Sequence, residues 1–271
     1  MPAASRNSAS WPARCKGHFR PLLDLSLFAN ARFVGVQVLA VAPAYAYIVL
    51  LVILPARFIG VEGYSVLDAG RMMIALSAPL LILPFIAGQL ARWIDVGTLS
   101  GIGLLIAAAG LAWLGHSIAS DGASRLLVMA LIGIGIALPW GVMDALAVSV
   151  VDKERAGMAA GIFNAMRLAG DGIALAVVDA TLSARILSEL LGLAGAAPSG
   201  AGAGGEWAAA ANRLVMGDMG NALRHLPAAG SAALRQAYEE AFRWQLLMLA
   251  VAAAITALLV FLLLSRVRTH D

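Results

Sequence analysis

Charged side chains are scarce in this sequence: only 13% of its 271 residues are Asp, Glu, Lys or Arg, whereas 61% are hydrophobic. A soluble domain usually carries about 25% charged residues and about 45–50% apolar ones. A fold surrounded by water could not cover so much apolar surface. Composition therefore excludes an ordinary soluble domain and indicates a protein that lies in a lipid bilayer.

Cysteine and histidine are scarce as well. The single cysteine, Cys15, excludes an internal disulfide and a cysteine-rich metal site, and the four histidines have no metal-ligand spacing. The sequence also has no phosphate-binding loop, zinc motif or serine nucleophile elbow. We therefore expect no catalytic residue, metal or cofactor, and no enzyme.

The small excess of basic residues does not indicate nucleic acid. The formal net charge is +3 and the pI is about 9.4, but the basic residues are scattered along the chain rather than gathered in a patch. Such a distribution is more typical of signals that orient membrane spans.

Long apolar segments predict the fold class, because a helix of about 20 residues crosses the hydrocarbon core of a bilayer. The sequence predicts an all-α membrane protein built as a six-helix bundle. The expected spans are Phe33–Leu54, Ala69–Leu90, Thr98–His116, Leu126–Val151, Ala156–Leu182 and Leu246–Leu264.

The remaining segments connect or flank these spans. Residues 1–32 and 265–271 are expected to be cytoplasmic, so that residues 33–182 contain five spans and residues 246–264 the sixth. Residues 183–245 are expected to form a long extracytoplasmic loop, with a Gly/Ala-rich linker at Gly192–Gly205 and then two short amphipathic helices divided by Pro227.

The orientation follows from the basic residues near the spans. Five precede the first span, and others lie in the second and fourth connections and after the last span, whereas the opposite short loops hold only Arg57, Arg71 and Arg125. Basic residues are enriched on the cytoplasmic side. We expect a multi-pass protein of the cell (inner) membrane with both termini in the cytoplasm, and residues 1–32 lack a signal-peptide pattern.

The fourth and fifth spans contain polar residues, and four of these are the main candidates for a functional site. They are Asp144, Asn164, Arg167 and Asp171. An ionisable residue costs roughly 2.5–3.5 kcal/mol at the centre of a membrane helix, so it persists mainly where it lines a polar path or has a partner. Asp144 and Arg167 have similar depth on neighbouring helices and can pair, while Asp171, four residues after Arg167, competes for the same arginine. The residues either line a path for substrate or protons, or form an ion pair that locks two helices.

Three further residues are weaker candidates for such a path. Gln37 and Tyr45 lie in the first expected span, and Trp140 lies one turn before Asp144. Each can add a polar or aromatic contact to a cavity, although helix packing is the more common role of such side chains.

Four motifs along the chain are informative together: "PLLDLSLF" at Pro21–Phe28, "GYSVLDAG" at Gly63–Gly70, "GIGIALP" at Gly133–Pro139 and "ERAGMAAGIFNAMRLAG" at Glu154–Gly170. They resemble motifs of the major facilitator superfamily, and in particular of its branch of fourteen-span drug:proton antiporters. By this resemblance the chain is similar to the carboxy-terminal half only, and the half with the proton-coupling acid is missing. The resemblance implies proton-coupled efflux of amphipathic small molecules and drugs.

The sequence departs from that branch at two places. The charge relay expected after Gly88 is degraded, because Gln89, Leu90 and Ala91 precede Arg92. Asp171 is atypical, which favours its interpretation as the counter-ion of Arg167. Asp144 and Arg167 are then the better candidates for a transport path.

Three functions remain to be compared. A half transporter would act as a homodimer or with a separately encoded amino-terminal half, with the lipid bilayer, a small-molecule substrate and protons as its partners. The alternative is a non-transporting membrane remnant or helical scaffold. An intramembrane aspartyl protease is disfavoured, because such enzymes carry Gly two residues before one catalytic Asp, where this chain has Ala169, and because Arg167 would keep Asp171 ionised.

Overall fold

A computed structural model describes residues 25–117, 122–193 and 203–264 of the chain. Cys15, most of the expected amino-terminal segment, most of the Gly/Ala-rich linker and the expected tail lie outside the described residues.

The described residues form helices and no strand, which confirms the all-α membrane fold class. The first long helix consists of α1 (Ala31–Pro43), the π-turn η2 (Ala44–Ile48) and α2 (Val49–Gly60). It is followed by α3 (Val66–Ser77), α4 (Pro79–Leu90), α5 (Val96–Ser117), α6 (Gly122–Ser149), α7 (Ala156–Leu193) and, after a connection, α10 (Gly230–Leu264). Shorter elements are η1 (Leu25–Ala29), η3 (Lys153–Arg155), α8 (Ala203–Val215), α9 (Met219–His225) and η4 (Pro227–Ala229).

Five helical segments in the described residues are long and apolar enough to cross a membrane. They are Ala31–Gly60, Val66–Leu90, Val96–Ser117, Ser124–Ser149 and Gly230–Leu264. Four of the expected spans lie within these segments, and a fifth, Leu126–Val151, was expected to end two residues after Ser149. The other expected span, Ala156–Leu182, is helical within α7 but less apolar, because it carries Asn164, Arg167, Asp171 and Asp179. A sixth crossing by α7 therefore stays a prediction.

Two helices extend well beyond the expected boundaries of their spans. The α7 helix continues to Leu193, and α10 already begins at Gly230. Pro227 therefore does not divide two short helices: α8 and α9 both precede it, and the segment after it is the first part of α10. The reason is a continuous buried stripe on α10 that joins the span without a break, formed by Leu234, Ala237, Tyr238, Ala241, Phe242 and Leu246.

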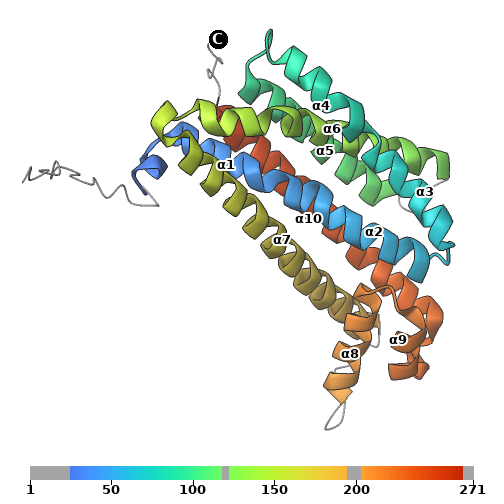
Figure 1. Ribbon diagram of the computed structural model, residues 1–271. Helices are drawn as coiled ribbons and strands as arrows, with labels where there is room; N and C mark the ends of the chain where they lie inside the picture. Colours follow the sequence, from blue (N-terminus) through green and yellow to red (C-terminus); the bar gives the residue numbers. More distant parts are fainter. Residues whose placement is uncertain (1–24, 118–121, 194–202, 265–271) are drawn as a thin grey trace, which may run out of the picture.

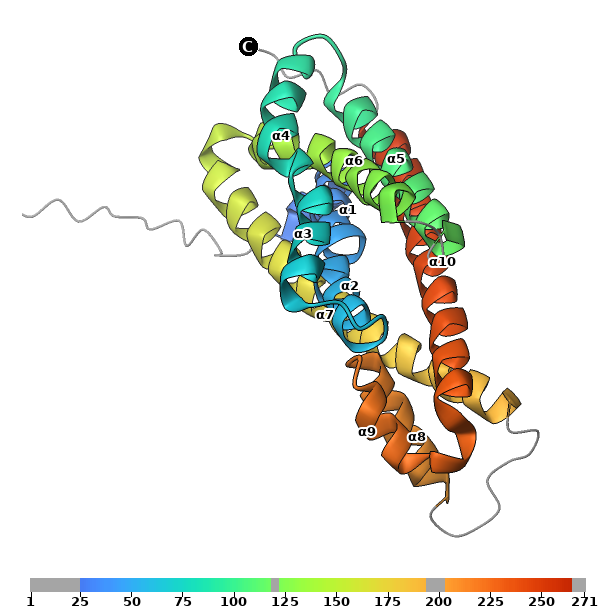
Figure 2. The same ribbon diagram turned by 90° about the vertical axis from the view of Figure 1, so that its right-hand side faces the viewer.

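Small residues bring α5 close to its neighbours. The α5 helix packs between α6 and α10, as Figures 1 and 2 show. A Cβ atom added at Gly103 would lie 2.5 Å from the carbonyl oxygen of Gly135 on α6, and one added at Gly97 would lie 2.6 Å from that of Leu264 on α10. Such close backbone approach is typical of helix packing in membranes.

The α3 and α4 helices lie on the outside of the bundle against α6 (Figure 2). Many of the side chains that they expose are apolar. Leu81 and Phe85 are 76% and 79% exposed.

The α8 and α9 helices pack together at one end of the bundle, beside the end of α7 and the start of α10 (Figure 1). The charge bias predicts that this end is extracytoplasmic, and we call it the α8–α9 end.

Candidate functional site

Asp144 and Arg167 form an ion pair between α6 and α7. The Arg167 Nη1 atom lies 3.7 Å from Asp144 Oδ1. The short turn containing η3 makes the two helices neighbours, and at 1.5 Å per residue both residues lie on the order of 10–15 Å into their spans. The side chains are 67% exposed for Asp144 and 30% for Arg167, so the pair lies at the surface of the bundle rather than in its core.

Asp171 is not the partner of Arg167. In the described part of the chain, Arg167 pairs with Asp144, and the buried Oδ1 atom of Asp171 has no hydrogen-bond partner. The expectation that Asp171 is the counter-ion is therefore wrong. The Arg167 side chain reaches across to α6, where a carboxylate lies at the same height, and Asp171 stays one helical turn further along α7.

Asn164 lies on the same exposed side of α7 as this pair. Its side-chain nitrogen donates to the Ala160 carbonyl oxygen at 3.1 Å, and the residue is exposed. We call Asp144, Asn164 and Arg167 the exposed α6–α7 face. Three of the seven candidates are thus gathered on one surface.

Besides Asp171, the remaining candidates are Gln37, Trp140 and Tyr45, and they lie elsewhere. Gln37 on α1 is 3% exposed, and neither polar atom of its amide has a partner among the described residues. Trp140 packs edge-to-face on Tyr47, with ring centroids 5.6 Å apart, and the Tyr47 hydroxyl donates to Ser77 Oγ at 3.0 Å. Trp140 therefore connects α6 to η2.

Tyr45 lines an apolar cavity of about 390 Å³ between α1, η2, α7 and α10. Its hydroxyl is buried inside the bundle. Gln245 of α10 lines the same cavity, is 1% exposed, and accepts a hydrogen bond of 2.9 Å from the Thr181 hydroxyl. The cavity has no charged residue in its lining, and sequence reasoning missed it because its residues come from three distant segments.

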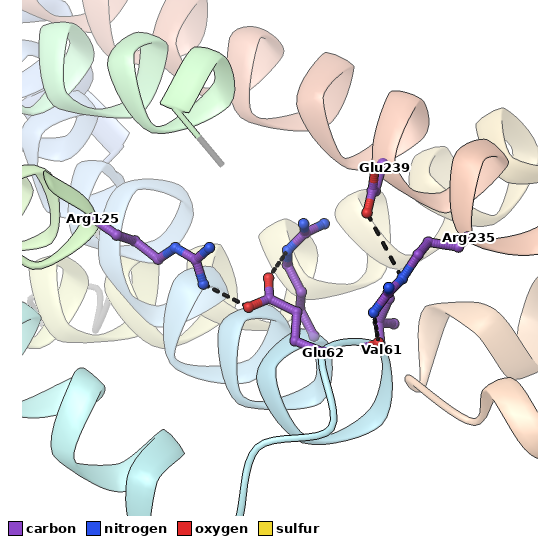
Figure 3. Close-up of polar contacts among 6 residues, drawn as sticks. Val61, Glu62, Arg125, Arg235 and Glu239 are labelled. Carbon is purple, nitrogen blue, oxygen red and sulfur yellow. Dashed lines mark hydrogen bonds and ion pairs between the residues drawn. The ribbon is translucent and has the colours of Figure 1, made fainter. Parts of the chain in front are cut away.

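A second charge cluster closes the α8–α9 end of the bundle. Glu62, in the turn between α2 and α3, accepts from Arg57 Nε at 2.8 Å through one carboxylate oxygen and from Arg125 through the other (Figure 3). We call Arg57, Glu62 and Arg125 the Glu62 clamp. Their side chains are only 2%, 14% and 7% exposed.

Aromatic rings complete the surroundings of the clamp. The Arg57 guanidinium lies 4.9 Å from the Phe242 ring centroid and 5.6 Å from that of Tyr238, both on α10, and Arg125 lies over Phe58. Rings at these distances attract a desolvated cation. The Arg235 side chain also donates to the Val61 carbonyl oxygen (Figure 3). The clamp thus connects α2, α6 and α10.

The clamp was not recognised from the sequence. In the sequence, Arg57 and Arg125 served only in the comparison of basic residues between the two sides of the membrane, as members of the side that has fewer. Arg125 and Glu62 are 63 residues apart in the chain. An available signal was the acidic Glu62 beside the end of an apolar span, because a carboxylate there needs a nearby cation.

No group of three or more His, Cys, Asp or Glu in the described residues could hold a metal ion. The arrangements described above are an exposed ion pair, an uncharged cavity and a closed clamp. These groups would allow the protein to bind a ligand and to change its conformation.

Comparison with known proteins assigns the family. The family model of the Major Facilitator Superfamily matches residues 2–175. The chain belongs to the Major Facilitator Superfamily. The exposed α6–α7 face and four of the long helical segments lie within that match, which confirms the superfamily indicated by the sequence motifs.

Two curated relatives are similar over part of the chain. Both are called multidrug resistance protein Stp, from two strains of Mycobacterium tuberculosis, CDC 1551 / Oshkosh and ATCC 25618 / H37Rv. Each is 29% identical over 171 residues, which are 63% of this chain and 32% of the relative. The chain thus matches about a third of the length of these major facilitator relatives.

Proposed function

We propose that this chain forms one side of a transporter that exports amphipathic small molecules in exchange for protons, with the exposed α6–α7 face on the transport path. The observation that carries the proposal is the 67% exposure of Asp144 at membrane depth. A charged side chain at that depth is too costly to face hydrocarbon. It therefore needs water or a second polar surface in front of it.

The geometry of the pair supports a working rather than a locking role. The Asp144 to Arg167 contact is a loose ion pair, because Asp144 Oδ1 and Arg167 Nη1 are 3.7 Å apart and both side chains are partly exposed. A proton on Asp144 would neutralise the carboxylate and release Arg167. Asp171, with its unpartnered oxygen one turn away, then offers the arginine a second carboxylate.

The second surface would be another copy of this chain or a separately encoded amino-terminal half. Transporters of related architecture bind substrate between two halves that move against each other. The protein would lie in the inner membrane of the cell. The basic residues favour an orientation in which both termini face the cytoplasm. The relatives' name, multidrug resistance protein, supports an amphipathic drug-like substrate.

Proteoliposomes test this proposal. The full chain is reconstituted alone and together with a co-expressed amino-terminal half, and uptake of the amphipathic dye ethidium is followed with and without an imposed pH gradient. We expect gradient-dependent uptake that Asp144→Asn reduces at least about a hundredfold, the lower end of the range in which positioned proton-transfer groups contribute. Asp179→Asn is the matched control, since Asp179 is also exposed on α7.

Two results would contradict the proposal. One is the absence of gradient-dependent flux in both preparations, which would favour a non-transporting scaffold. The other is flux in which Asp144→Asn behaves like Asp179→Asn, which would remove Asp144 from the path.

A further inference from the structure

Two helix ends meet at the α8–α9 end of the bundle. The α2 helix ends at Gly60, and α8 ends at Val215, two residues before Gly217. A Cβ atom added at Gly60 would overlap the carbonyl oxygen of Gly217, and one added at Gly217 would overlap that of Ala56 on α2. The two backbones therefore touch with no side chain between them. A larger residue at either glycine would force the helix ends apart.

The turn at Gly217 has a defined shape of its own. Gly217 has a φ of 76°, and its N–H donates to the Leu214 carbonyl oxygen at 2.9 Å. The Asp218 N–H donates to the Arg213 carbonyl oxygen, also at 2.9 Å, which completes the usual glycine-ended terminus of a helix. Asp218 then caps α9 by accepting from the Asn221 N–H at 3.1 Å. The turn therefore docks on α2 as a preformed unit.

The other side of the α8–α9 pair holds α7. The Ser183 hydroxyl of α7 donates to the side-chain oxygen of Asn212 on α8 at 2.5 Å. Ala211 and Leu214 of α8 are fully buried, and α8 packs beside the end of α7 (Figure 1). The α8–α9 pair thus connects the end of α7 to the end of α2.

The α2 helix is the fixed partner in this connection. Arg57 of the Glu62 clamp lies one helical turn before Gly60. The start of α10 is held at the same place, because Arg235 donates to the Val61 carbonyl oxygen at 2.6 Å (Figure 3). The end of α2 and the start of α10 therefore stay together without help from α8 or α9.

The α7 helix is held less closely than α2. A Cβ atom added at Gly161 or Gly172 meets nothing within 4 Å, so this side of α7 is open. On its other side, the apolar cavity of about 390 Å³ separates α7 from parts of α1, η2 and α10. Space on both sides leaves α7 free to shift unless its end is held.

We infer that α8 and α9 form a strap, which ties the end of α7 to the clamped end of α2 and keeps the α8–α9 end of the bundle closed. The strap detaches at the contact between Gly60 and Gly217, where no side chain interlocks. In the transport cycle proposed above, this end opens when the two halves move, and the strap leaves α2 at that step. That role rests on the proposed function, whereas the restraint on α7 does not.

Hydrogen exchange of the full chain in nanodiscs, followed by mass spectrometry, tests the strap without a transport assay. Gly60→Ala and Gly217→Ala each insert a Cβ atom into the contact between α2 and the turn. We expect either substitution to accelerate exchange in α8, in α9 and in the end of α7 at least about fivefold, the lower end of what overpacking produces. Exchange at the start of α10 should stay unchanged, because Arg235 holds it separately.

Two glycines provide matched controls. Gly230 has a similar φ of 72°, but a Cβ atom added there meets nothing within 4 Å. Gly220 of α9 has neither the positive φ nor a close neighbour. Gly230→Ala and Gly220→Ala should therefore leave exchange in α7 and α8 as in the parent chain. Acceleration in Gly230→Ala equal to that in Gly60→Ala would indicate general destabilisation and overturn the inference.

Ser183→Ala detaches the strap from α7 alone. We expect exchange in the end of α7 to rise at least about twofold, the effect of one lost hydrogen bond, and exchange in α9 to stay unchanged because its turn remains on α2. The variant loses only one exposed hydroxyl, so it decides the question even if neither glycine variant folds.

One pattern would overturn the inference outright. If Gly60→Ala accelerates exchange in α8 and α9 but leaves the end of α7 unchanged, these helices are a spacer and not a strap. The expected exchange pattern in a chain that shows no dye uptake would support the strap and contradict only the proposed transport.

Discussion

The Glu62 clamp and the exposed α6–α7 face both contain arginine and carboxylate, but their surroundings differ. In the clamp, Glu62 joins two arginines that are 2% and 7% exposed, and aromatic rings cover them. On the exposed face, one arginine meets one carboxylate at 3.7 Å, and Asp144 is 67% exposed. A buried network resists separation because its charges have no other partner, whereas an exposed pair can exchange one partner for another. The clamp therefore fixes one end of the bundle, and the α6–α7 pair remains free to change.

The largest effect is expected from breaking the clamp. Glu62→Ala leaves two buried arginines without their shared carboxylate, and removing one member of a buried network costs about 3–5 kcal/mol of folding free energy. Chemical unfolding in detergent, followed by circular dichroism, measures this change.

The matched control for the clamp is Glu239→Gln. Glu239 pairs with Arg235 at 3.9 Å with both side chains about half exposed, so its loss should cost no more than about 1 kcal/mol. Equal effects of the two substitutions would show that the clamp does not hold this end of the bundle.

A smaller effect is expected from glycine substitutions that compare the closed and open parts of the bundle. Gly103→Ala places a Cβ atom 2.5 Å from the Gly135 carbonyl oxygen and should cost about 1–3 kcal/mol through overpacking. Gly161→Ala on α7 meets nothing within 4 Å and should stabilise the helix by about 0.5–1 kcal/mol. The same unfolding assay measures both, and a loss of stability in Gly161→Ala would mean that another surface already covers this side of α7.

The smallest effect on stability is expected at the exposed pair itself. Arg167→Gln should change the free energy of unfolding by no more than about 1 kcal/mol, since exposed ion pairs contribute little. It should nevertheless reduce gradient-dependent dye uptake as strongly as Asp144→Asn. A large loss of stability would identify the pair as a lock between α6 and α7, the alternative that the sequence left open.

Much of this fold could be predicted from the sequence, because apolar segments of bilayer length stand out by composition alone. The segments that became α5 and α6 were placed to within a few residues of their ends. The extensions of α7 and α10 could not be placed in this way. They are held by buried stripes among polar residues, such as Ile186 and Leu190 on α7, and hydropathy does not separate such stripes from a loop.

The candidate site was predicted less completely than the fold. Spacing along α6 and α7 was enough to suggest the Asp144 to Arg167 contact, because a short turn fixes the register of two neighbouring helices. It could not decide between Asp144 and Asp171 as the partner, since that depends on the direction of one side chain. The Glu62 clamp brings together residues far apart in the sequence, which one sequence alone does not reveal.

Access of water to the exposed α6–α7 face tests the central claim most directly. In a Cys15→Ser background, which removes the only cysteine of the sequence, Asn164→Cys and Val251→Cys each introduce one thiol at an exposed helical position, on α7 and α10. The two variants are then labelled in membranes with a charged methanethiosulfonate and with a lipid-soluble maleimide. We predict that Asn164→Cys reacts with the charged reagent, while Val251→Cys reacts only with the lipid-soluble one. Protection of Asn164→Cys from the charged reagent, with labelling by the maleimide alone, would contradict a polar path along this face.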